Sequence, residues 1–331
     1  ESGDDLATVI FNADGMGYGL FPARFRHLAR WANLSGVEKG SLLIYLRENM
    51  LEGRDVGPSA YLGALIKVVA VEKNQLFLGL VLAQMLEIYN TLLTVQQQAA
   101  FLPHLEATLW QATNNATEGG SVRLFFETFS SVASSSDRLD VIYKIWAGEK
   151  NLDALSLSEE DLTRLAQILA IRLPDKSEKI IATQMGRMES PDSRRRLAFL
   201  VPSLSADEAT RDAFFSSLAD ENNRQTESWV LDALQNLHHP SRTAQSQKYL
   251  QRSLELLEEI QATGDIFFPT GWLHASFENH GSPAAVALAD EFLAARPDYN
   301  AQLRMKVQQA LDLPRRAVVI HSRSNSGQKT Q

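Results

Sequence analysis

Apolar side chains recur at helical spacing over most of the chain. From about Pro22 onward they follow the i, i+3, i+4, i+7 pattern of helices that bury one face. Three clear sets are Leu162, Leu165, Ala166, Leu169 and Leu173; Leu250, Leu254, Leu257 and Ile260; and Ala285, Leu288, Ala289, Phe292 and Leu293. Proline and glycine interrupt the pattern often, so we expect about sixteen helices of roughly 10 to 20 residues joined by short loops.

Several of these helices begin with capping signals. Ser158 to Asp161 and Ser205 to Glu208 resemble capping boxes, in which a serine oxygen and a downstream carboxylate bind the first free backbone amides. Pro191 follows Ser190, and proline is favoured in the first helical turn, where its missing N–H costs nothing. We therefore expect helices to start at these three places.

The N-terminal residues carry the clearest strand-like pattern. Thr8–Phe11 is rich in β-forming residues, Asn12–Gly15 supplies turn residues, and Tyr18–Phe21 can form a returning strand. Two short strands are marginal alone in water, so we expect residues 1–21 to be a β-hairpin that needs a sheet partner upstream of Glu1. The hairpin and the missing initiator methionine predict that the chain is a piece of a longer protein.

These patterns predict an all-α fold over residues 22–316, preceded by the short β-hairpin. The sequence shows no strict repeat of about 34 or 40 residues, so we expect an irregular superhelical array of antiparallel helix pairs. Such an armadillo- or HEAT-like bowl has a concave surface that can bind a partner. Residues 317–331 contain basic and small polar residues but no acid, and we expect a flexible tail there.

Composition narrows the class of protein. The chain has no cysteine, which excludes a disulfide framework, a thiolate metal site and a cysteine nucleophile. Its net charge of −8 argues against a nucleic-acid partner. The longest apolar run, Leu76–Ala83, is shorter than the about 20 residues of a membrane span, so we expect no membrane insertion. The first residues also lack the basic and apolar regions of a signal peptide.

Familiar catalytic motifs are missing from the sequence. There is no H-E-x-x-H, no Walker loop and no G-x-S-x-G elbow. Gly15, Gly17 and Gly19 lack the spacing of a dinucleotide-binding loop and suit a tight turn better. We find no assembled nucleophile, base and orienting group, so we predict that this chain alone is catalytically inactive and holds no metal or cofactor.

His274, Glu278 and His280 come nearest to a metal-ligand cluster. On a helix His274 and Glu278 share a face, whereas His280 lies beside Gly281, past the expected helix end. Zinc needs three or four convergent ligands, so we interpret these residues as an exposed helix end. A stand-alone enzyme with zinc at these residues stays as an alternative.

Three further sets have both a structural and a chemical interpretation. His238-His239-Pro240 is typical of a helix C-terminus, with a catalytic histidine as the alternative. Arg194–Arg196 is typical of a solvated face, because successive helical residues point in different directions, with a phosphate site as the alternative. We interpret the aromatic set as core rather than as a ligand box; it comprises Trp229, Phe267, Phe268, Trp272 and Phe292.

The segment from Trp229 to Arg316 has a distinctive residue pattern. It contains Thr263-Gly264-Asp265-Ile266-Phe267-Phe268-Pro269-Thr270-Gly271-Trp272, and later Phe292-Leu293-Ala294-Ala295-Arg296-Pro297-Asp298-Tyr299. Near the other end stands Phe11-Asn12-Ala13-Asp14-Gly15-Met16-Gly17-Tyr18-Gly19. These stretches resemble the C-terminal helical domain of zinc metallo-aminopeptidases of the aminopeptidase N family, particularly a bacterial branch.

The resemblance implies a parent enzyme with a catalytic domain and a β-sandwich domain, both upstream of Glu1. In that family an H-E-x-x-H motif and a downstream glutamate hold the zinc, and peptide substrates lose their N-terminal residues. The helical domain caps the active-site chamber and governs peptide access. The matching residues are structural in this interpretation, and no substrate-contacting residue is assigned. The compartment, bacterial cytoplasm or periplasm, stays open.

A second interpretation also stays open. The chain could be an independent helical scaffold that binds a protein or a peptide in its concave face. We further expect an exposed apolar strip near the hairpin, because the β-sandwich domain that would cover it is missing from this chain.

Overall fold

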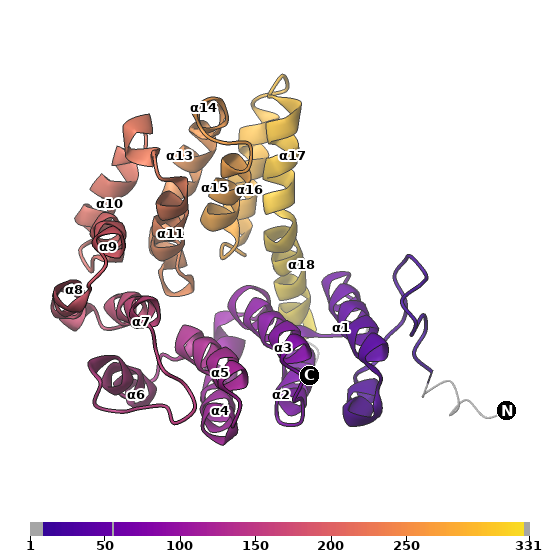
Figure 1. Cartoon of the computed structure of the whole chain (residues 1–331). Helices are drawn as coiled ribbons and strands as arrows, with labels where there is room; N and C mark the ends of the chain where they lie inside the picture. Colours follow the sequence, from indigo (N-terminus) through magenta and orange to yellow (C-terminus); the bar gives the residue numbers. More distant parts are fainter. Residues whose placement is uncertain (1–8, 55, 328–331) are drawn as a thin grey trace. The chain divides into compact units, whose positions relative to one another are not determined.

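The computed structural model describes residues 9–54 and 56–327 (Figure 1). Close backbone contacts divide these residues into two compact units. Unit 1 contains the described residues up to Ala133, together with Leu152–Leu155 and the stretch from Val319 onward. Unit 2 contains Ser134–Asn151 and Ser156–Val318.

Every regular element in the described residues is helical, and no β-strand is assigned among them. Unit 1 consists of a 3-10 helix η2 (Phe25–Asn33), α1 (Gly36–Leu51), α2 (Pro58–Val69), α3 (Gln75–Glu87), a π-helix η3 (Ile88–Leu92), α4 (Val95–Asn115) and α5 (Gly119–Val132). The fold is therefore all-α with helices that pack on their neighbours in sequence, as the periodicity predicts.

Unit 2 continues the same architecture. Its α-helices are α6 (Ser136–Ala147), α7 (Glu159–Arg172), α8 (Ser177–Arg187), α9 (Pro191–Leu204), α10 (Glu208–Ser217), α11 (Glu227–Leu237), α12 (Thr243–Ser246), α13 (Leu250–Glu255), α14 (Leu257–Thr263), α15 (Phe268–Phe277), α16 (Pro283–Ala294) and α17 (Ala301–Ala310). Short 3-10 turns link some of them: η4 (Pro174–Lys176), η5 (Glu221–Arg224), η6 (Pro240–Arg242) and η7 (Gln247–Tyr249).

Alternate helices of unit 2 form a continuous layer. Helix α7 packs on α9, α9 on α11, α11 on α15, and α15 on α17. Helices α8 and α10 pack beside members of this layer (Figure 1). Because consecutive helices joined by short loops run antiparallel, the alternate helices α7, α9 and α11 run parallel and bring their C-terminal ends together.

Large apolar side chains of the last helices form the core of unit 2. Trp272 is fully buried, and Phe268 and Phe292 join it in one cluster that extends to Leu311. The core interpretation is thus confirmed for Phe268, Trp272 and Phe292. Phe267 contradicts it, because its side chain is 74% exposed. Trp229 is half-buried and packs its ring against Phe199.

Arginine side chains cap the C-terminal carbonyls of several helices. Arg242 donates to the carbonyls of Ser203, Leu204 and Ser205 at 2.9, 3.0 and 3.1 Å, at the end of α9. In the same way Arg187 donates to Trp146 at the end of α6, at 2.8 Å. These carbonyls have no partner inside their own helix, and a cation also complements the negative end of the helix dipole.

The predicted helix starts are correct at two of three places. Ser158 forms a complete capping box with Asp161, and Ser190 caps the helix that has Pro191 in its first turn. At the third place the N-cap is Asp207, whose side chain accepts from the Thr210 amide at 2.9 Å. The Ser205 hydroxyl instead accepts from the Asp207 amide, so the helix begins two residues later than predicted.

The predicted β-hairpin does not form in the described residues 9–21. The Asn12 side chain takes the place of a partner strand, because its amide accepts from the Gly17 N–H at 2.6 Å and donates to the Gly17 carbonyl at 2.9 Å. Asn12 itself has a φ of 51° and Gly15 a φ of 72°, so the chain turns back as an irregular loop. Two short strands without a sheet are too weak to compete with these local bonds. Thr8 lies outside the described residues.

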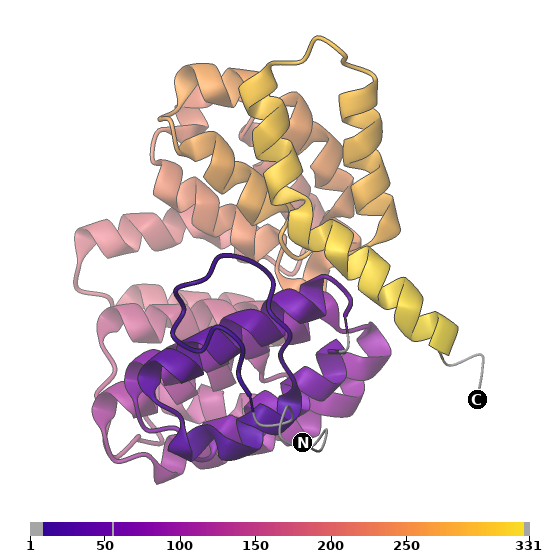
Figure 2. The same ribbon diagram turned by 90° about the vertical axis from the view of Figure 1, so that its right-hand side faces the viewer.

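The predicted flexible tail is wrong for residues 317–327. Helix α18 (Asp312–Gly327) continues through this stretch, starting in unit 2 and ending in unit 1 (Figure 2). Ala317 and Ile320 are buried, and Arg323 donates to the Gly53 carbonyl at 3.1 Å. Buried apolar residues at i and i+3 thus extend a helix into a segment that looks polar overall. Residues 328–331 lie outside the described residues.

One stretch, Gln75–Leu92, is long and apolar enough to cross a membrane by length and composition. Its window is 44% buried inside the protein, and core helices can pass the same test of length and composition. It covers α3 and the π-helix η3, and Leu78, Val81, Leu82 and Met85 pack in the interior of unit 1.

Candidate functional site

A cleft of about 410 Å³ lies on the layer of alternate helices in unit 2. We call it the α7–α11 cleft, because α7, α9 and α11 supply nearly all of its walls. Its lining comprises Glu160, Thr163, Arg164, Gln167, Ile168, Ile171, Met188, Ser193, Arg196, Leu197, Leu200, Asp232, Gln235, Asn236 and His239. The volume falls within the range of about 300 to 1,000 Å³ that is usual for small-ligand pockets.

The charged side chains lie toward the N-terminal ends of these helices. Arg196 of α9 donates to one carboxylate oxygen of Asp232 of α11, at 3.1 Å from Nε and 2.7 Å from Nη2. Glu160 and Arg164 of α7 lie one turn apart. This half of the cleft therefore carries two positive and two negative charges.

The middle of the cleft is apolar. Ile171, Leu197 and Leu200 are buried beneath it, and Ile168 and Met188 complete the floor. Apart from Met188, these apolar residues lie on the same helices as the polar lining residues. The cleft therefore has an apolar floor and walls that can form hydrogen bonds. Sites that hold small organic ligands commonly have this composition.

His239 closes the C-terminal end of the cleft. Its Nδ1 accepts from the Ser241 backbone N–H at 3.2 Å and lies 2.8 Å from the Ser241 hydroxyl. Burial, and then the nearby charges of Arg172 and Arg242, lower the pKa of His239 to about 3. The ring is therefore neutral near pH 7, and the Ser241 bond assigns its proton to Nε2.

Two buried arginines lie at the C-terminal end of α9, near the His239 end of the cleft. Arg211 and Arg242 are 5% and 7% exposed. Both bind carbonyls at the end of α9, and Arg211 also donates to Gln245 at 2.8 Å. Neither forms an ion pair with another described residue. Arg172, the last residue of α7, and Arg242 are the two positive charges that act on His239.

Unit 1 has a cleft of its own, of about 590 Å³, between the end of α2 and the facing ends of α4 and α5. Glu72 is its most constrained charged residue. The Glu72 carboxylate accepts from the Trp31 indole at 2.7 Å and from Lys39 at 2.8 Å, through the same oxygen. Its other oxygen accepts from the backbone of Lys73 and Asn74. The bonds to Trp31 and Lys39 tie the α2–α3 connection to η2 and α1, and the two backbone bonds fix that connection locally, so we interpret this network as structural.

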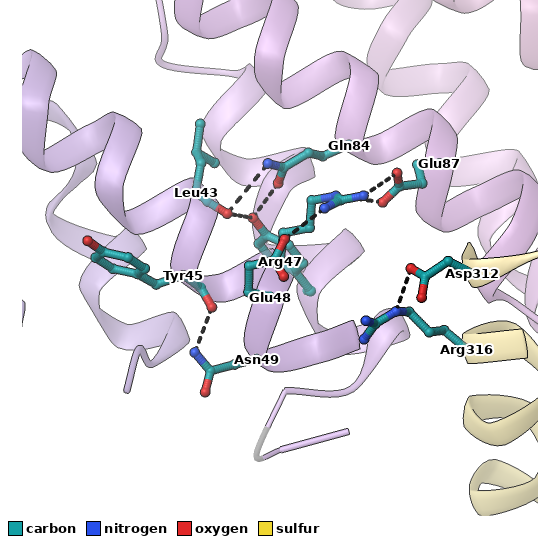
Figure 3. A network of polar contacts seen from close by, with 10 residues as sticks. Leu43, Tyr45, Arg47, Glu48, Asn49, Gln84, Glu87, Asp312 and Arg316 are labelled. Atoms are coloured by element: carbon teal, nitrogen blue, oxygen red, sulfur yellow. Dashed lines mark hydrogen bonds and ion pairs between the residues drawn. The ribbon is translucent and has the colours of Figure 1, made fainter. Parts of the chain in front are cut away.

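A second network in unit 1 links α1 to the end of α3 (Figure 3). Arg47 donates from Nε and Nη2 to the two oxygens of Glu87, both at 2.8 Å. Beside it the Tyr61 hydroxyl donates to Gln84 at 2.5 Å, and the Gln84 amide lies 3.4 Å from the Leu43 carbonyl. This network holds α3 in place where the π-helix η3 begins.

The structure does not bring together the three residues considered for a metal. His274 Nδ1 lies 3.1 Å from a Glu278 oxygen on the surface of α15. His280 is 2% exposed, and its Nε2 lies 2.8 Å from Nδ1 of His238 in the core. His274, Glu278 and His280 therefore do not converge on a common metal position in the structure. Among the described residues no group of three histidine, aspartate or glutamate side chains could hold a metal.

The two neighbouring histidines at the end of α11 have different places. His238 ends the helix and points into the core, whereas His239 lines the α7–α11 cleft. The prediction of a helix C-terminus is confirmed. The pairing with His280 could not be read from the sequence, because the two residues are 42 positions apart.

The three consecutive arginines of α9 bind three separate partners. Arg194 donates to the Met188 carbonyl, Arg195 pairs with Asp192 on the same helix, and Arg196 pairs with Asp232. They form no common anion site, so the solvated-face interpretation is confirmed. Only Arg196 contributes to the cleft.

Sequence comparison adds no assignment to this geometry. No protein-family model matches the chain, and no curated protein matches it either. Fold and site together define an all-α helical-repeat protein with a mixed-charge cleft on one helix layer.

Proposed function

We propose that this chain is the non-catalytic C-terminal helical domain of a zinc aminopeptidase of the aminopeptidase N family. In this proposal it caps the active-site chamber of the parent enzyme and governs which peptides enter. The parent removes N-terminal residues from peptides with zinc held in a separate catalytic domain. The all-α helical-repeat fold supports the proposal, since such folds act mainly by offering extended binding surfaces.

The N-terminal loop is the observation that carries the proposal. Asn12 donates to the Tyr45 hydroxyl of α1, and that hydroxyl also lies 3.2 Å from the Asn12 carbonyl. The loop thus rests on α1, yet Met16 and Tyr18 are 86% and 106% exposed. Val9 and Phe11 are 42% and 44% exposed, and these four side chains support the expected apolar strip. A fixed loop with exposed apolar side chains suits a junction with a neighbouring domain.

The motif from Thr263 to Trp272 has a structural explanation. The Asp265 carboxylate accepts from the amides of Phe267 and Phe268 at 2.6 and 3.0 Å and so starts α15. A side chain at position 264 would meet the Phe268 ring at 2.6 Å, which explains the glycine. Trp272 donates from its indole to the Ser253 carbonyl at 3.2 Å in the core. These residues support a shared fold rather than a shared substrate contact.

No described residue set fits the zinc that the parent enzyme needs. We therefore assign the metal to the catalytic domain of the parent and derive no chemistry through it here. The contribution of this chain is to bind, orient and admit peptides, and we take the α7–α11 cleft as the candidate surface for this role.

The coding sequence upstream of Glu1 tests the proposal most directly. We expect an open reading frame in the same register that encodes an H-E-x-x-H motif followed by a glutamate. An aminopeptidase assay of this chain alone, with alanyl and leucyl chromogenic substrates and added zinc, should show no turnover. A reading frame without the zinc motif would overturn the proposal, and so would zinc-dependent turnover that survives repurification.

A stand-alone helical scaffold is the second candidate function. The α7–α11 cleft favours it as much as the first, because a peptide-binding surface needs no attached enzyme. In that case a gene starting near Glu1 and a partner retained by the purified chain are expected.

A further inference from the structure

The two ends of the α7–α11 cleft differ in electrostatic character. At the N-terminal end Glu160 and Arg164 offset each other, and Asp232 is already paired with Arg196. No acidic side chain lines the other end, where His239 lies. The side-chain charges that act on His239 are those of Arg172 and Arg242, both positive, so an anionic group would be favoured beside them.

The carbonyls at the C-terminus of α9, beside His239, are already capped by arginine side chains. Exposed carbonyls at a helix C-terminus would normally repel an anion. Here Arg242 and Arg211 bind the last carbonyls of α9, and among the described residues no carboxylate pairs with either arginine. The charge of each guanidinium can therefore attract an anionic ligand, while its N–H groups remain bonded to the α9 carbonyls.

Hydrogen-bond donors are also present at the right place. The Nε2–H of His239 is available because Ser241 occupies Nδ1. The side-chain amides of Gln167 and Gln235 line the same cleft and make no hydrogen bond to described residues. Beside them Ile168 and Ile171 offer apolar surface.

We propose that the α7–α11 cleft binds a short peptide segment that carries a carboxylate, with the carboxylate at the His239 end and apolar neighbours on Ile168 and Ile171. The His239 Nε2–H and the two glutamine amides donate to the carboxylate, and Arg172 and Arg242 stabilise its charge. This inference rests on the proposed peptide-handling function and names the class of peptide that the domain prefers.

Three blocked tripeptides test the proposal by isothermal titration calorimetry with the full chain. They are acetyl-Leu-Glu-Leu-amide, acetyl-Leu-Gln-Leu-amide and acetyl-Leu-Gln-Leu with a free C-terminal carboxylate. We expect at least one carboxylate peptide to bind about tenfold more tightly than the neutral amide, since a charge-assisted hydrogen bond is worth more than a neutral one. Which one binds identifies the source as a side chain or a chain terminus. Equal binding of all three, or no binding, would overturn the proposal.

Two variants locate the site. His239→Ala should remove most of the preference for the carboxylate peptide. Arg195→Gln is the matched control, because Arg195 is an exposed arginine of α9 that pairs with Asp192 outside the cleft. An unchanged preference in His239→Ala, with the fold intact by circular dichroism, would contradict the assignment.

Histidine NMR of the unaltered chain gives a readout that does not depend on folding of a variant. A carboxylate bound beside the ring should raise the pKa of His239 from its low value, whereas the neutral peptide should leave it unchanged. An unshifted His239 with saturating carboxylate peptide would overturn the proposed position. The upstream reading frame decides the aminopeptidase assignment separately, so either idea can fail alone.

Discussion

The Nδ1 atom of His238 lies 2.8 Å from the Nε2 atom of His280 in the core of unit 2. His238 ends α11, and His280 follows α15, so the pair joins two neighbouring helices of the same layer. The two residues are 0% and 2% exposed, and the His238 Nε2 has no hydrogen-bond partner among the described residues. Such a pair is stable only while both rings are neutral, with one ring donating to the other.

Acid should destabilise unit 2 through this pair. Burial lowers the pKa of His280 to about 4, and burial together with the charge of His280 lowers the pKa of His238 well below its usual value. In the unfolded chain both histidines take up protons near pH 6.5, whereas in the folded chain they stay neutral to a lower pH. The contribution of the pair to the free energy of unfolding is therefore complete above about pH 6.5 and is lost as the pH falls toward about 4. Each histidine contributes a slope of about 1.4 kcal/mol per pH unit in that window.

Urea unfolding at several pH values between about 7 and about 4.5 measures this slope. The double variant His238→Phe, His280→Leu should flatten it. His274→Gln is the control, because Glu278 holds the pKa of the exposed His274 above its usual value, which is the opposite sign. A slope that is the same in the double variant and the unaltered chain would refute the role of the pair.

Glu72 should be essential to unit 1 because its carboxylate joins three segments. Replacing it by glutamine removes the charge opposite Lys39 and leaves the Trp31 indole with a weaker acceptor. We expect Glu72→Gln to lower the free energy of unfolding by about 1–3 kcal/mol. Chemical denaturation measures the change, with Glu178→Gln on the surface of α8 as a control. Equal stability of the two variants would contradict the structural interpretation of the network.

The N-terminal loop should loosen when Asn12 is replaced by alanine. Asn12→Ala removes both bonds to Gly17 and forces alanine into a left-handed conformation, which costs about 1–2 kcal/mol. Limited proteolysis should then cut faster near Met16 and Tyr18. Asn12→Asp keeps an acceptor for the Gly17 N–H and should stay more resistant. Identical cleavage rates in all three chains would show that Asn12 does not hold the loop.

Gln184 should stabilise unit 2 through a buried polar cluster. The Gln184 carbonyl accepts from the Trp146 indole at 2.9 Å and from Arg187 at 2.7 Å, and its amide donates to Thr163 at 2.9 Å. Gln184→Leu leaves the Trp146 indole and the Arg187 Nε without this acceptor, and we expect a loss of about 1–3 kcal/mol per uncompensated group.

Denaturation followed by tryptophan fluorescence measures the effect of Gln184→Leu. Gln308→Leu, at an exposed position of α17, is the control and should change stability little. A Gln184 variant as stable as this control would show that the cluster contributes nothing measurable.

The sequence pattern predicted the helices well because the interactions that form a helix join residues close together in the chain. The apolar stripe of residues 162–173 and the capping box at Ser158 both act within one or two turns, and α7 has both. The hairpin failed for the converse reason. A strand needs a distant partner, whereas the Asn12 side chain satisfies the Gly17 backbone only five residues away.

The sequence by itself determined the all-α class, the helix starts at Ser158 and Ser190 and the core role of Trp272, since these depend on local capping, periodicity and hydrophobicity. Only the tertiary structure decided which polar residues meet. His238 and His280 pair across 42 positions, and His239 reaches the cleft because α7, α9 and α11 align side by side. Such contacts follow from the packing of separate helices, and no spacing along the chain encodes them. His238 and His239 are neighbours in the chain, but His238 faces His280 in the core and His239 faces the cleft.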